Sequence, residues 1–348
     1  MTTPVQSKLL KTSDARALPA GESYKGIYIV SGIQKKTDKN GKTFWDISVS
    51  DERGTLNAKV WSDAGWVDRS NPDPESKPGF LAESEISSLR GHVVGVNGKT
   101  VDFRGQVQHN FNTITLLDEE KFSPSNYVAH SEIPLEILDS RFDDLIGKCS
   151  PEIRDFLRFV FDGPRLKAFR SAPAAVANHH AYANGLIEHT VSVTEAALAM
   201  ANHYRDIYPS LNVSLVIAGA LLHDLGKISA YAMSPAPEIT VQGAVLDHIA
   251  IGFADFSRLA GEAGLAPDIS TQIGHVILSH HGQKEFGSPV LPATLEALIV
   301  ASADELDFRL FCWNDATSDM PAGQSISAFN FAMERRFWRP RGDDDASR

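Results

Sequence analysis

The segment "IAGALLHDLGK" (Ile217–Lys227) is an apolar run that passes directly into a histidine and an aspartate. The apolar part suits a buried helix, and such a helix does not ordinarily end on two adjacent side chains that bind metals. His223 and Asp224 are therefore either a chance polar terminus or the centre of a metal site. Gly226 is placed where a glycine would end the helix. The remaining histidines decide between these two interpretations.

Nine of the twelve histidines lie between His179 and His281, far more than an even spread over 348 residues would place there. Imidazoles with nearby carboxylates form the ligand sets of Zn, Fe, Mn, Co or Ni. Asp304 lies in an otherwise apolar helical stretch, where a buried carboxylate is unfavourable unless a cation or hydrogen bonds compensate it. The candidate metal ligands are His189, His223, Asp224, His248, His280, His281 and Asp304.

Other roles remain open for single residues in this region. His203 and His275 fit the ordinary role of a packed or exposed histidine. His179 and His180 could face a substrate instead of a metal. Lys227 is close enough to Asp224 to neutralise a phosphate oxygen, although an exposed lysine at a helix end is an equally good interpretation.

Composition and charge set the broad class. The 43% hydrophobic and 22% charged residues are ordinary for a globular protein, and no run of about 18 apolar residues predicts a membrane span. The two cysteines and the polar N-terminus favour a reduced, cytoplasmic protein without structural disulfides. Residues 1–120 carry 15 basic and 16 acidic residues, and the remainder carries 18 and 28. The net charge of −11 therefore belongs to the C-terminal part, and the N-terminal part could still present a local basic face to nucleic acid.

Residues 20–118 predict a β domain. "YKGIYIVSGIQ" alternates, "NG" at 40–41 is a hairpin signal, and "FWDISVSD" and "TLNAKVW" continue the alternation. A helical segment at 79–90 and two further strands follow. Three strands, a helix and two strands are the order of a five-stranded OB barrel, a fold that binds single-stranded nucleic acid by stacking bases on aromatic side chains beside cations. The candidate contacts are Phe44, Lys59, Trp61, Tyr28 and Phe103, and packing inside the barrel is the competing role for each aromatic residue.

The predicted domain limits are an OB domain at 15–120, a linker at 121–135, an all-helical domain at 136–315 and a C-terminal extension at 316–348 with an acidic, disordered end. The expected helices cover roughly 150–170, 185–204, 211–224, 243–264, 268–281 and 293–312. The Arg-rich "ERRFWRPR" (residues 334–341) in the extension has no assigned role.

The ordered set His189, His223–Asp224, His248, His280–His281 and Asp304 resembles the HD superfamily of metal-dependent phosphohydrolases. "HHAYANGLIEHT", "HDLGK", "SHHGQKEFGSPVLPATLEA" and "ADELD" further resemble the YhaM-type 3′-to-5′ exoribonucleases, which place an OB domain before an HD domain. The resemblance covers roughly residues 20–312. It implies cleavage of single-stranded RNA, or of DNA, from the 3′ end, with manganese as the metal and with Fe, Co, Ni, Zn or Mg as other options.

The same resemblance implies roles for the candidate ligands. His189, His223, Asp224 and Asp304 would hold one metal. Asp224 would bridge to a second metal held by His248 and His280, with His281 as a further ligand or substrate contact. A carboxylate suits bridging because it has two oxygens, whereas a neutral imidazole offers one lone pair.

Three other functions stay open at this stage. One is hydrolysis of a nucleotide or a small phosphate ester, and another is a mixed-valent di-iron oxygenase, which the ligand set permits. The third is a non-catalytic nucleic-acid-binding protein. Assembly into a homo-oligomer, in which several barrels would share one strand, is also open.

Overall fold

The computed structural model describes residues 9–340 apart from residues 40, 72, 74–75, 104, 177–179, 234–236, 319 and 321–322. The chain divides into two compact units, residues 1–130 with 233–237 and residues 131–232 with 238–348. Three predictions fall outside the described residues: Asn40 of the hairpin signal, His179, and the acidic end at 342–348.

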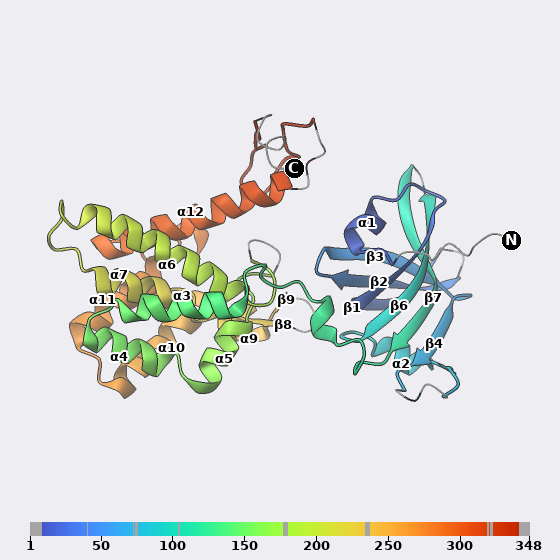
Figure 1. Ribbon diagram of the computed structural model, residues 1–348, viewed down its shortest axis with the longest axis horizontal. Coiled ribbons are helices and arrows are strands. Elements are labelled where there is room, and N and C mark those ends of the chain that lie inside the picture. Colours follow the sequence, from blue (N-terminus) through green and yellow to red (C-terminus); the bar gives the residue numbers. More distant parts are fainter. Residues whose placement is uncertain are drawn as a thin grey trace. The chain divides into compact units, whose positions relative to one another are not determined.

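The first unit is a closed β barrel (Figure 1). Strand β1 pairs antiparallel with β2 and β6, β2 pairs with β3, and β6 pairs with β7. A parallel pairing of β3 with β7 closes the five strands into a barrel, as the OB prediction requires. The five strands are β1 (Ser23–Thr37), β2 (Thr43–Asp51), β3 (Gly54–Trp61), β6 (Val93–Phe103) and β7 (Gln106–Leu117).

Four short elements supplement the barrel, and their bounds are α1 (Thr12–Arg16), β4 (Gly65–Arg69), β5 (Gly79–Phe80) and α2 (Glu83–Ser87). The predicted helical segment at 79–90 is thus shorter than expected and begins as a strand. Strand β4 was not predicted, because five residues are too few to display an alternation and its partner β7 is distant in the sequence.

The barrel core is built from alternate residues of the strands, as a sheet with one inward face requires. The inward set is Tyr24, Tyr28, Val30, Trp45, Ile47, Val49, Leu56, Ala58 and Val60, joined by Val94, Val96, Phe111 and Ile114. The alternation in the sequence separated two faces of each strand, and the structure shows which of them is inside.

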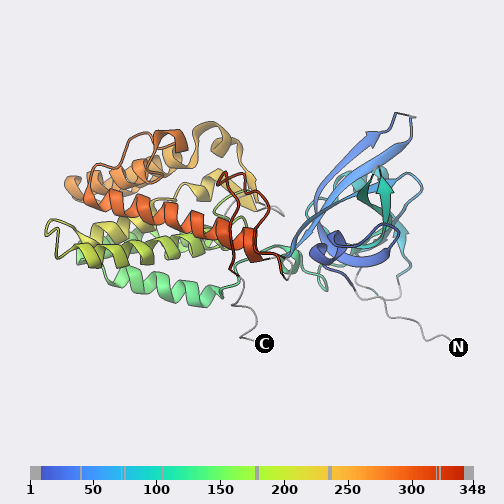
Figure 2. The ribbon, with the colours of Figure 1, turned by 90° about the horizontal axis from the view of Figure 1, so that it is seen from above.

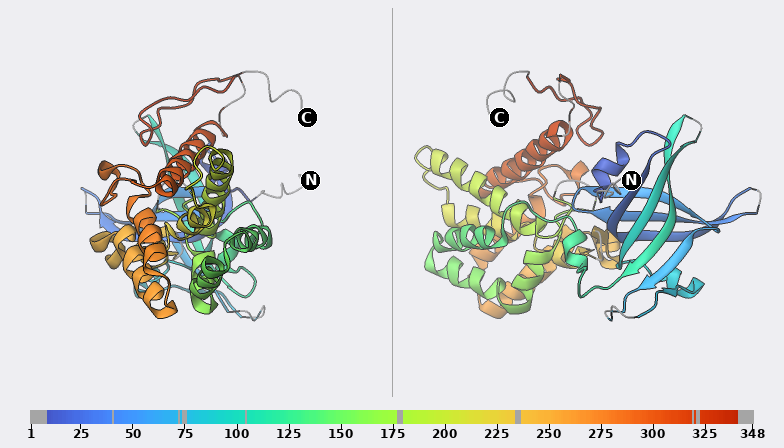
Figure 3. Two further views of the ribbon diagram at one scale, coloured as in Figure 1. Left: turned by 90° about the vertical axis from the view of Figure 1, so that its left-hand side faces the viewer. Right: turned by 45° about the vertical axis from the view of Figure 1, so that its right-hand side comes forward.

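The second unit is helical, and Figures 2 and 3 show its longer helices packed as a bundle. The first unit ends with η1 (Pro124–Tyr127). The helices of the second unit are α3 (Leu135–Gly147), α4 (Pro151–Val160), α5 (Gly163–Ser171), α6 (Gly185–Tyr204), α7 (Val213–Leu222), α8 (Lys227–Ala230), α9 (Val241–Leu246), α10 (His248–Ala263), α11 (Pro267–Ser279), η2 (Lys284–Phe286) and α12 (Leu295–Ser318). A short hairpin of β8 (Tyr231–Met233) and β9 (Pro237–Ile239) lies between α8 and α9.

Two predicted helices are each divided in the structure, and α3 was not predicted. The segment 150–170 breaks at Asp162 and Gly163, where the glycine has a positive φ of 51° and a proline follows. The segment 243–264 breaks at Asp247, which has φ 65° and then caps α10 by accepting a hydrogen bond from Ile249 N. A left-handed residue cannot continue a right-handed helix.

Helix α7 is the central helix of the second unit. Every residue from Leu215 to Leu222 is buried, and the helix contributes to both apolar clusters of this unit. The stretch Val213–Ala230 has the length and apolarity of a membrane span, but 78% of it is buried inside the protein, as expected of a core helix.

Candidate metal centre

Helix α7 delivers His223 and Asp224 into the interior of the helical unit. Asn212 caps its first turn by accepting hydrogen bonds from Ser214 N and Leu215 N, and the apolar body of the helix is packed on all sides. His223 and Asp224 follow at its C-terminal end and are each 1% exposed. A carboxylate buried to this degree requires compensating charge or hydrogen bonds.

Gly226 has a different role from the predicted helix terminator. Its backbone, at φ −66° and ψ −16°, is one that any residue can adopt. A Cβ at this position would lie 2.0 Å from His248 O and 2.5 Å from Gly252 N, distances that no real Cβ tolerates. The glycine therefore allows the first turn of α10, which carries His248, to approach the His223–Asp224 corner.

The two carboxylate oxygens of Asp224 face two different pairs of imidazoles. Oδ2 lies 3.3 Å from His189 Nε2 and 3.2 Å from His223 Nε2. Oδ1 lies 3.5 Å from His248 Nε2 and 3.6 Å from His280 Nε2. One carboxylate thus separates an Oδ2 side, with His189 and His223, from an Oδ1 side, with His248 and His280.

Each of these histidines, and His281, has its other ring nitrogen held by a fixed acceptor. The Nδ1 contacts are His189 to Asp307 Oδ2 (2.8 Å), His223 to Ala220 O (2.6 Å), His248 to Asp247 Oδ1 (2.7 Å), His280 to Ile277 O (2.8 Å) and His281 to Phe286 O (2.7 Å). Since carbonyl and carboxylate oxygens only accept, we assign the proton to Nδ1 in all five rings. In the neutral ring Nε2 then carries the lone pair, and the second hydrogen bond fixes the ring orientation, as is usual for metal-bound histidine.

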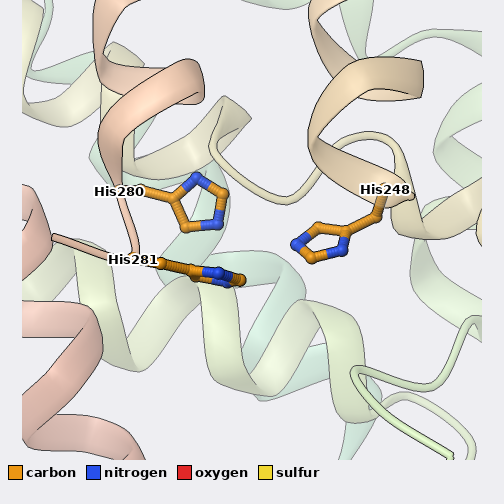
Figure 4. Close-up of side chains that lie close together, drawn as sticks. All are labelled: His248, His280 and His281. Carbon is orange, nitrogen blue, oxygen red and sulfur yellow. The ribbon is translucent and has the colours of Figure 1, made fainter. Parts of the chain in front are cut away.

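Three buried atoms on the Oδ1 side lack a hydrogen-bond partner among the described residues: Asp224 Oδ1, His248 Nε2 and His280 Nε2. All three are acceptors, so they cannot satisfy one another. Buried polar atoms are almost always paired, and a group of converging lone pairs fits a cation. His281 completes the Oδ1 side, since it, His248 and His280 offer ligand atoms within 4.8 Å of one another, and Figure 4 shows the three rings converging from two helix ends.

Asp304 of α12 lies on the Oδ2 side. Its Oδ1 is 3.2 Å from His189 Nε2 and 3.8 Å from His223 Nε2. The Oδ2 side therefore combines two imidazoles with two carboxylates, whereas the Oδ1 side has three imidazoles and shares the single carboxylate of Asp224. Both donor sets suit divalent transition metals.

Lys227 is buried, so of the two interpretations open for it, the exposed lysine at a helix end is wrong. Its Nζ lies 2.7 Å from Asp224 Oδ2. Burial alone would lower the pKa of Lys227, but the charge of Asp224 outweighs burial and raises it, so the ammonium stays charged. A carboxylate oxygen has two lone pairs, which leaves one for a second cation beside Lys227.

The protonation states of most of the surrounding groups also fit a metal. Burial lowers the pKa of His189, but Asp224, Asp304 and Asp307 outweigh it and raise the pKa well above its usual range, so His189 would release its Nε2 proton on binding a metal. Burial raises the pKa of Asp224, but Lys227 and His223 outweigh this and hold the pKa well below its usual range. Burial and the neighbouring His281 lower the pKa of His280, and burial lowers the pKa of His281. Ionised carboxylates and neutral imidazoles are the forms that bind metals.

Comparison with known proteins agrees with this geometry. The HD domain family model matches residues 186–309, which contain the ligand candidates from His189 to Asp304. The protein named 3′-5′ exoribonuclease YhaM from Bacillus subtilis (strain 168) is 30% identical over 323 residues, which cover 92% of this chain and 96% of that protein. This chain belongs to the YhaM family. The protein of the same name from Geobacillus sp. (strain WCH70) is 29% identical over 322 residues, 92% of this chain and 93% of its own length.

Asp307 is a site residue of this YhaM-family chain that the sequence analysis missed. It lies one helical turn after Asp304 and accepts hydrogen bonds from Nδ1–H of His189 and from Ser192 Oγ. The sequence could have indicated Asp307, because a residue three positions after Asp304 lies on the same face of a helix. Asp247, which holds His248, was missed as well, and its position directly before that histidine was the signal.

His180 is not positioned as the predicted substrate contact. It is buried, its Nε2 lies 3.4 Å from Asp307 Oδ2, and its Nδ1 lies 2.6 Å from Tyr182 Oη. Tyr182 in turn donates to Glu188 Oε2 at 3.0 Å. His180 therefore supports Asp307, which orients His189. His203 is exposed and His275 Nε2 accepts from Ala293 N, as the ordinary roles predicted for them require.

Two of the five predicted nucleic-acid contacts on the barrel are wrong. Tyr28 is fully buried and donates a hydrogen bond to Leu10 O. Phe44 is 7% exposed, because Lys59 Nζ lies 4.4 Å over its ring and Trp61 packs beside it at 5.1 Å between ring centroids. Both residues contribute to the packing of the barrel and cannot stack on a base.

The other three predicted contacts border hollows on the barrel. Lys59 and Phe103, which is 55% exposed, line a hollow together with Asp46, Asn57, Gln106 and His109. Trp61 lines a second hollow with Lys42, Asn110 and Asn112, and Lys42 Nζ lies 5.2 Å from its ring centroid. A cation beside an accessible ring is the pairing that single-stranded nucleic acid uses.

Proposed function

We propose that this chain is a metal-dependent hydrolase that removes nucleotides from the 3′ end of single-stranded RNA, with single-stranded DNA as a second substrate. The observation that carries the proposal is the Asp224 carboxylate, which presents one oxygen to each of two imidazole pairs. Membership in a family whose curated members are named 3′-5′ exoribonuclease supports the reaction and its direction.

The ligand sets proposed for two manganese ions follow the two sides of Asp224. His189, His223, Asp224 and Asp304 would hold the ion on the Oδ2 side. Asp224, His248, His280 and His281 would hold the ion on the Oδ1 side. Such ions, when bound, lower the pKa of water and neutralise the oxygens of the phosphodiester.

The chain's own residues supply position and charge for this reaction. Asp307, supported by His180, fixes the ring of His189, and Asp247 fixes the ring of His248. Lys227 holds a positive charge beside Asp224, where it would neutralise a phosphate oxygen in the transition state. On the barrel, Lys59, Trp61 and Phe103 are the proposed contacts to the RNA strand, and an RNA bound by stacking would show little sequence preference.

The test is a time course with 5′-labelled single-stranded RNA, with and without manganese. The wild-type protein should produce a ladder that shortens from the 3′ end only with the metal, and Asp224→Asn should produce none while binding RNA normally. Asp206→Asn, a change of an aspartate with a 90% exposed side chain in the same unit, is the matched control and should cleave like wild type. Cleavage by Asp224→Asn at the wild-type rate would refute the assignment of the site.

The same assay separates the other functions. Hydrolysis of nucleotides or small phosphate esters without any cleavage of RNA would establish the small-substrate enzyme. Cleavage under anaerobic conditions excludes an oxygenase, and a protein that binds RNA but no divalent ion would be the non-catalytic binder.

Three further expectations belong to the proposal. We propose a cytoplasmic protein, a homo-oligomer that engages one strand with several barrels, and domains at 15–120 and 136–315. Helix α12 continues to Ser318, so the helical domain needs at least these three further residues. Sedimentation analysis of the purified protein measures the assembly state.

A further inference from the structure

The chain continues after α12 into a small hairpin at residues 323–340, the dark red segment beyond α12 in Figure 1. Backbone bridges pair Ile326 with Trp338 and Asn330 with Arg335. Ser327 is buried at its centre, donates from its N to Phe337 O and accepts from Phe337 N at its Oγ. This hairpin is therefore an ordered element, and the function proposed above leaves it without a role.

Arg339 joins the hairpin to the helix that carries the metal site. Its guanidinium donates to Thr317 O in the last turn of α12 at 2.7 Å and to Met320 O just beyond that helix at 3.4 Å. From Asp304 to Ser318 the helix axis measures about 21 Å at 1.5 Å per residue. A strand whose 3′ end reaches Asp304 would have to be several nucleotides long to reach the hairpin.

The hairpin exposes large aromatic side chains. Phe331 is 86% exposed, Trp338 63% and Phe329 43%, and the rings of Phe329 and Phe331 contact each other edge to face, with their planes at 77°. Proteins rarely leave several large apolar side chains in water on one small element unless a partner covers them. Flat rings in this position can stack on unpaired bases.

The charge of the hairpin favours a polyanion as that partner. Arg335, Arg336 and Arg339 lie among these aromatic residues, with Glu334 as the one acid at 323–340, whereas the C-terminal part of the chain as a whole carries ten more acidic than basic residues. Arg335 and Arg336 are exposed. Their side chains donate to Met333 O and Ser327 O, which orients the guanidinium groups while leaving further N–H donors for phosphate.

We propose that the hairpin at 323–340 is a second single-strand contact of this enzyme, which stacks bases on Phe331 and Trp338 and neutralises phosphates with Arg335 and Arg336. It binds the RNA upstream of the 3′ end that the metal centre cleaves. This inference rests on the proposed exonuclease function. A dinucleotide is too short to reach the hairpin, so the hairpin acts only on longer substrates.

The test compares Phe331→Ala/Trp338→Ala and Arg335→Gln/Arg336→Gln with wild type. Binding is measured by fluorescence anisotropy in the non-cleaving Asp224→Asn protein, with a labelled RNA of about 16 nucleotides, enough to fill a single-strand site. Losing stacked bases should raise the Kd about fivefold or more per base. Phe331→Trp keeps a stacking surface and should keep the wild-type Kd. Phe159→Ala and Arg205→Gln change an exposed aromatic residue and an exposed arginine elsewhere in the same unit and should have no effect.

Cleavage of a dinucleotide by the hairpin variants in the otherwise active protein should equal wild type, while KM for the long RNA should rise. An unchanged Kd of the hairpin variants for the long RNA overturns the proposal. If the sedimentation mass of these variants changes at the same time, the hairpin is a protein–protein surface instead. If wild-type protein cleaves no phosphodiester and the Kd still depends on the hairpin, the exonuclease function fails and the RNA contact stands.

Discussion

The two sides of the Asp224 carboxylate differ in charge and in access to solvent. On the Oδ2 side, Asp304 adds a second carboxylate and Lys227 one positive charge beside Asp224 Oδ2, and His189 and His223 are sealed in the interior. On the Oδ1 side, three imidazoles share Asp224, His281 is partly exposed, and the side chain of Asp247 is 66% exposed. A carboxylate-rich, sealed position should bind a cation tightly, and an imidazole-rich position near solvent should exchange its metal and meet the substrate.

The largest effect should come from removing the charge that distinguishes the Oδ2 side. Asp304→Asn should lower kcat/KM by about 10³-fold, because it weakens the tight metal and loses several kcal/mol of charge stabilisation. Asp315→Asn, at an exposed position of the same helix, should behave like wild type. Steady-state cleavage of labelled RNA at saturating manganese measures kcat/KM for both variants. A loss smaller than tenfold for Asp304→Asn would contradict the conclusion that the Oδ2 side binds the tighter metal.

A smaller effect is expected on the Oδ1 side. His248→Ala should lower activity by about 100-fold at low manganese and recover part of it as the manganese concentration rises, since only the exchangeable position is damaged. His203→Ala, at an exposed histidine, is the control. A manganese titration of the rate gives the result, and no recovery at any concentration would place the tight metal on the Oδ1 side instead.

The carboxylates that orient the ligands allow a matched comparison. Asp307→Asn should weaken manganese binding on the Oδ2 side by about 10–100-fold, the usual loss for a residue that orients a metal-bound histidine. Asp247→Asn should cause a smaller loss on the Oδ1 side, because solvent screens that exposed side chain. Calorimetric titration with manganese compares the two, and a larger loss for Asp247→Asn would reverse the expected order.

The smallest effect concerns the packing that brings the Oδ1 side to Asp224. Gly226→Ala should lower the free energy of unfolding by about 1–3 kcal/mol, because its Cβ would collide with the backbone of His248 and Gly252. Gly261→Ala, in α10, has open space around its Cβ and should be neutral or stabilising. Urea unfolding measures both variants, and equal stability for them would refute the close approach as the reason for Gly226.

The grouping of the candidate metal ligands was predictable from the sequence because few residue types bind metals and they occur in an ordered set along the helices. His189, His248 and His280 come from three different helices, yet their residue type and order identified them together. The barrel contacts were harder to predict. Alternation separates two faces of a strand without saying which is inside, so Tyr28 was placed in the solvent, and it does not show that Lys59 and Trp61 cover Phe44 on the outer face. Asp247 and Asp307 act through another residue, and only the folded structure shows which imidazole each one holds.

The most direct test of a carboxylate shared by two metals is the number of manganese ions bound per chain. Equilibrium dialysis followed by elemental analysis should give two ions for wild type, one retained ion for His248→Ala, and weakened binding of both for Asp224→Asn. One ion in wild type, or the loss of both ions in His248→Ala, would contradict the account.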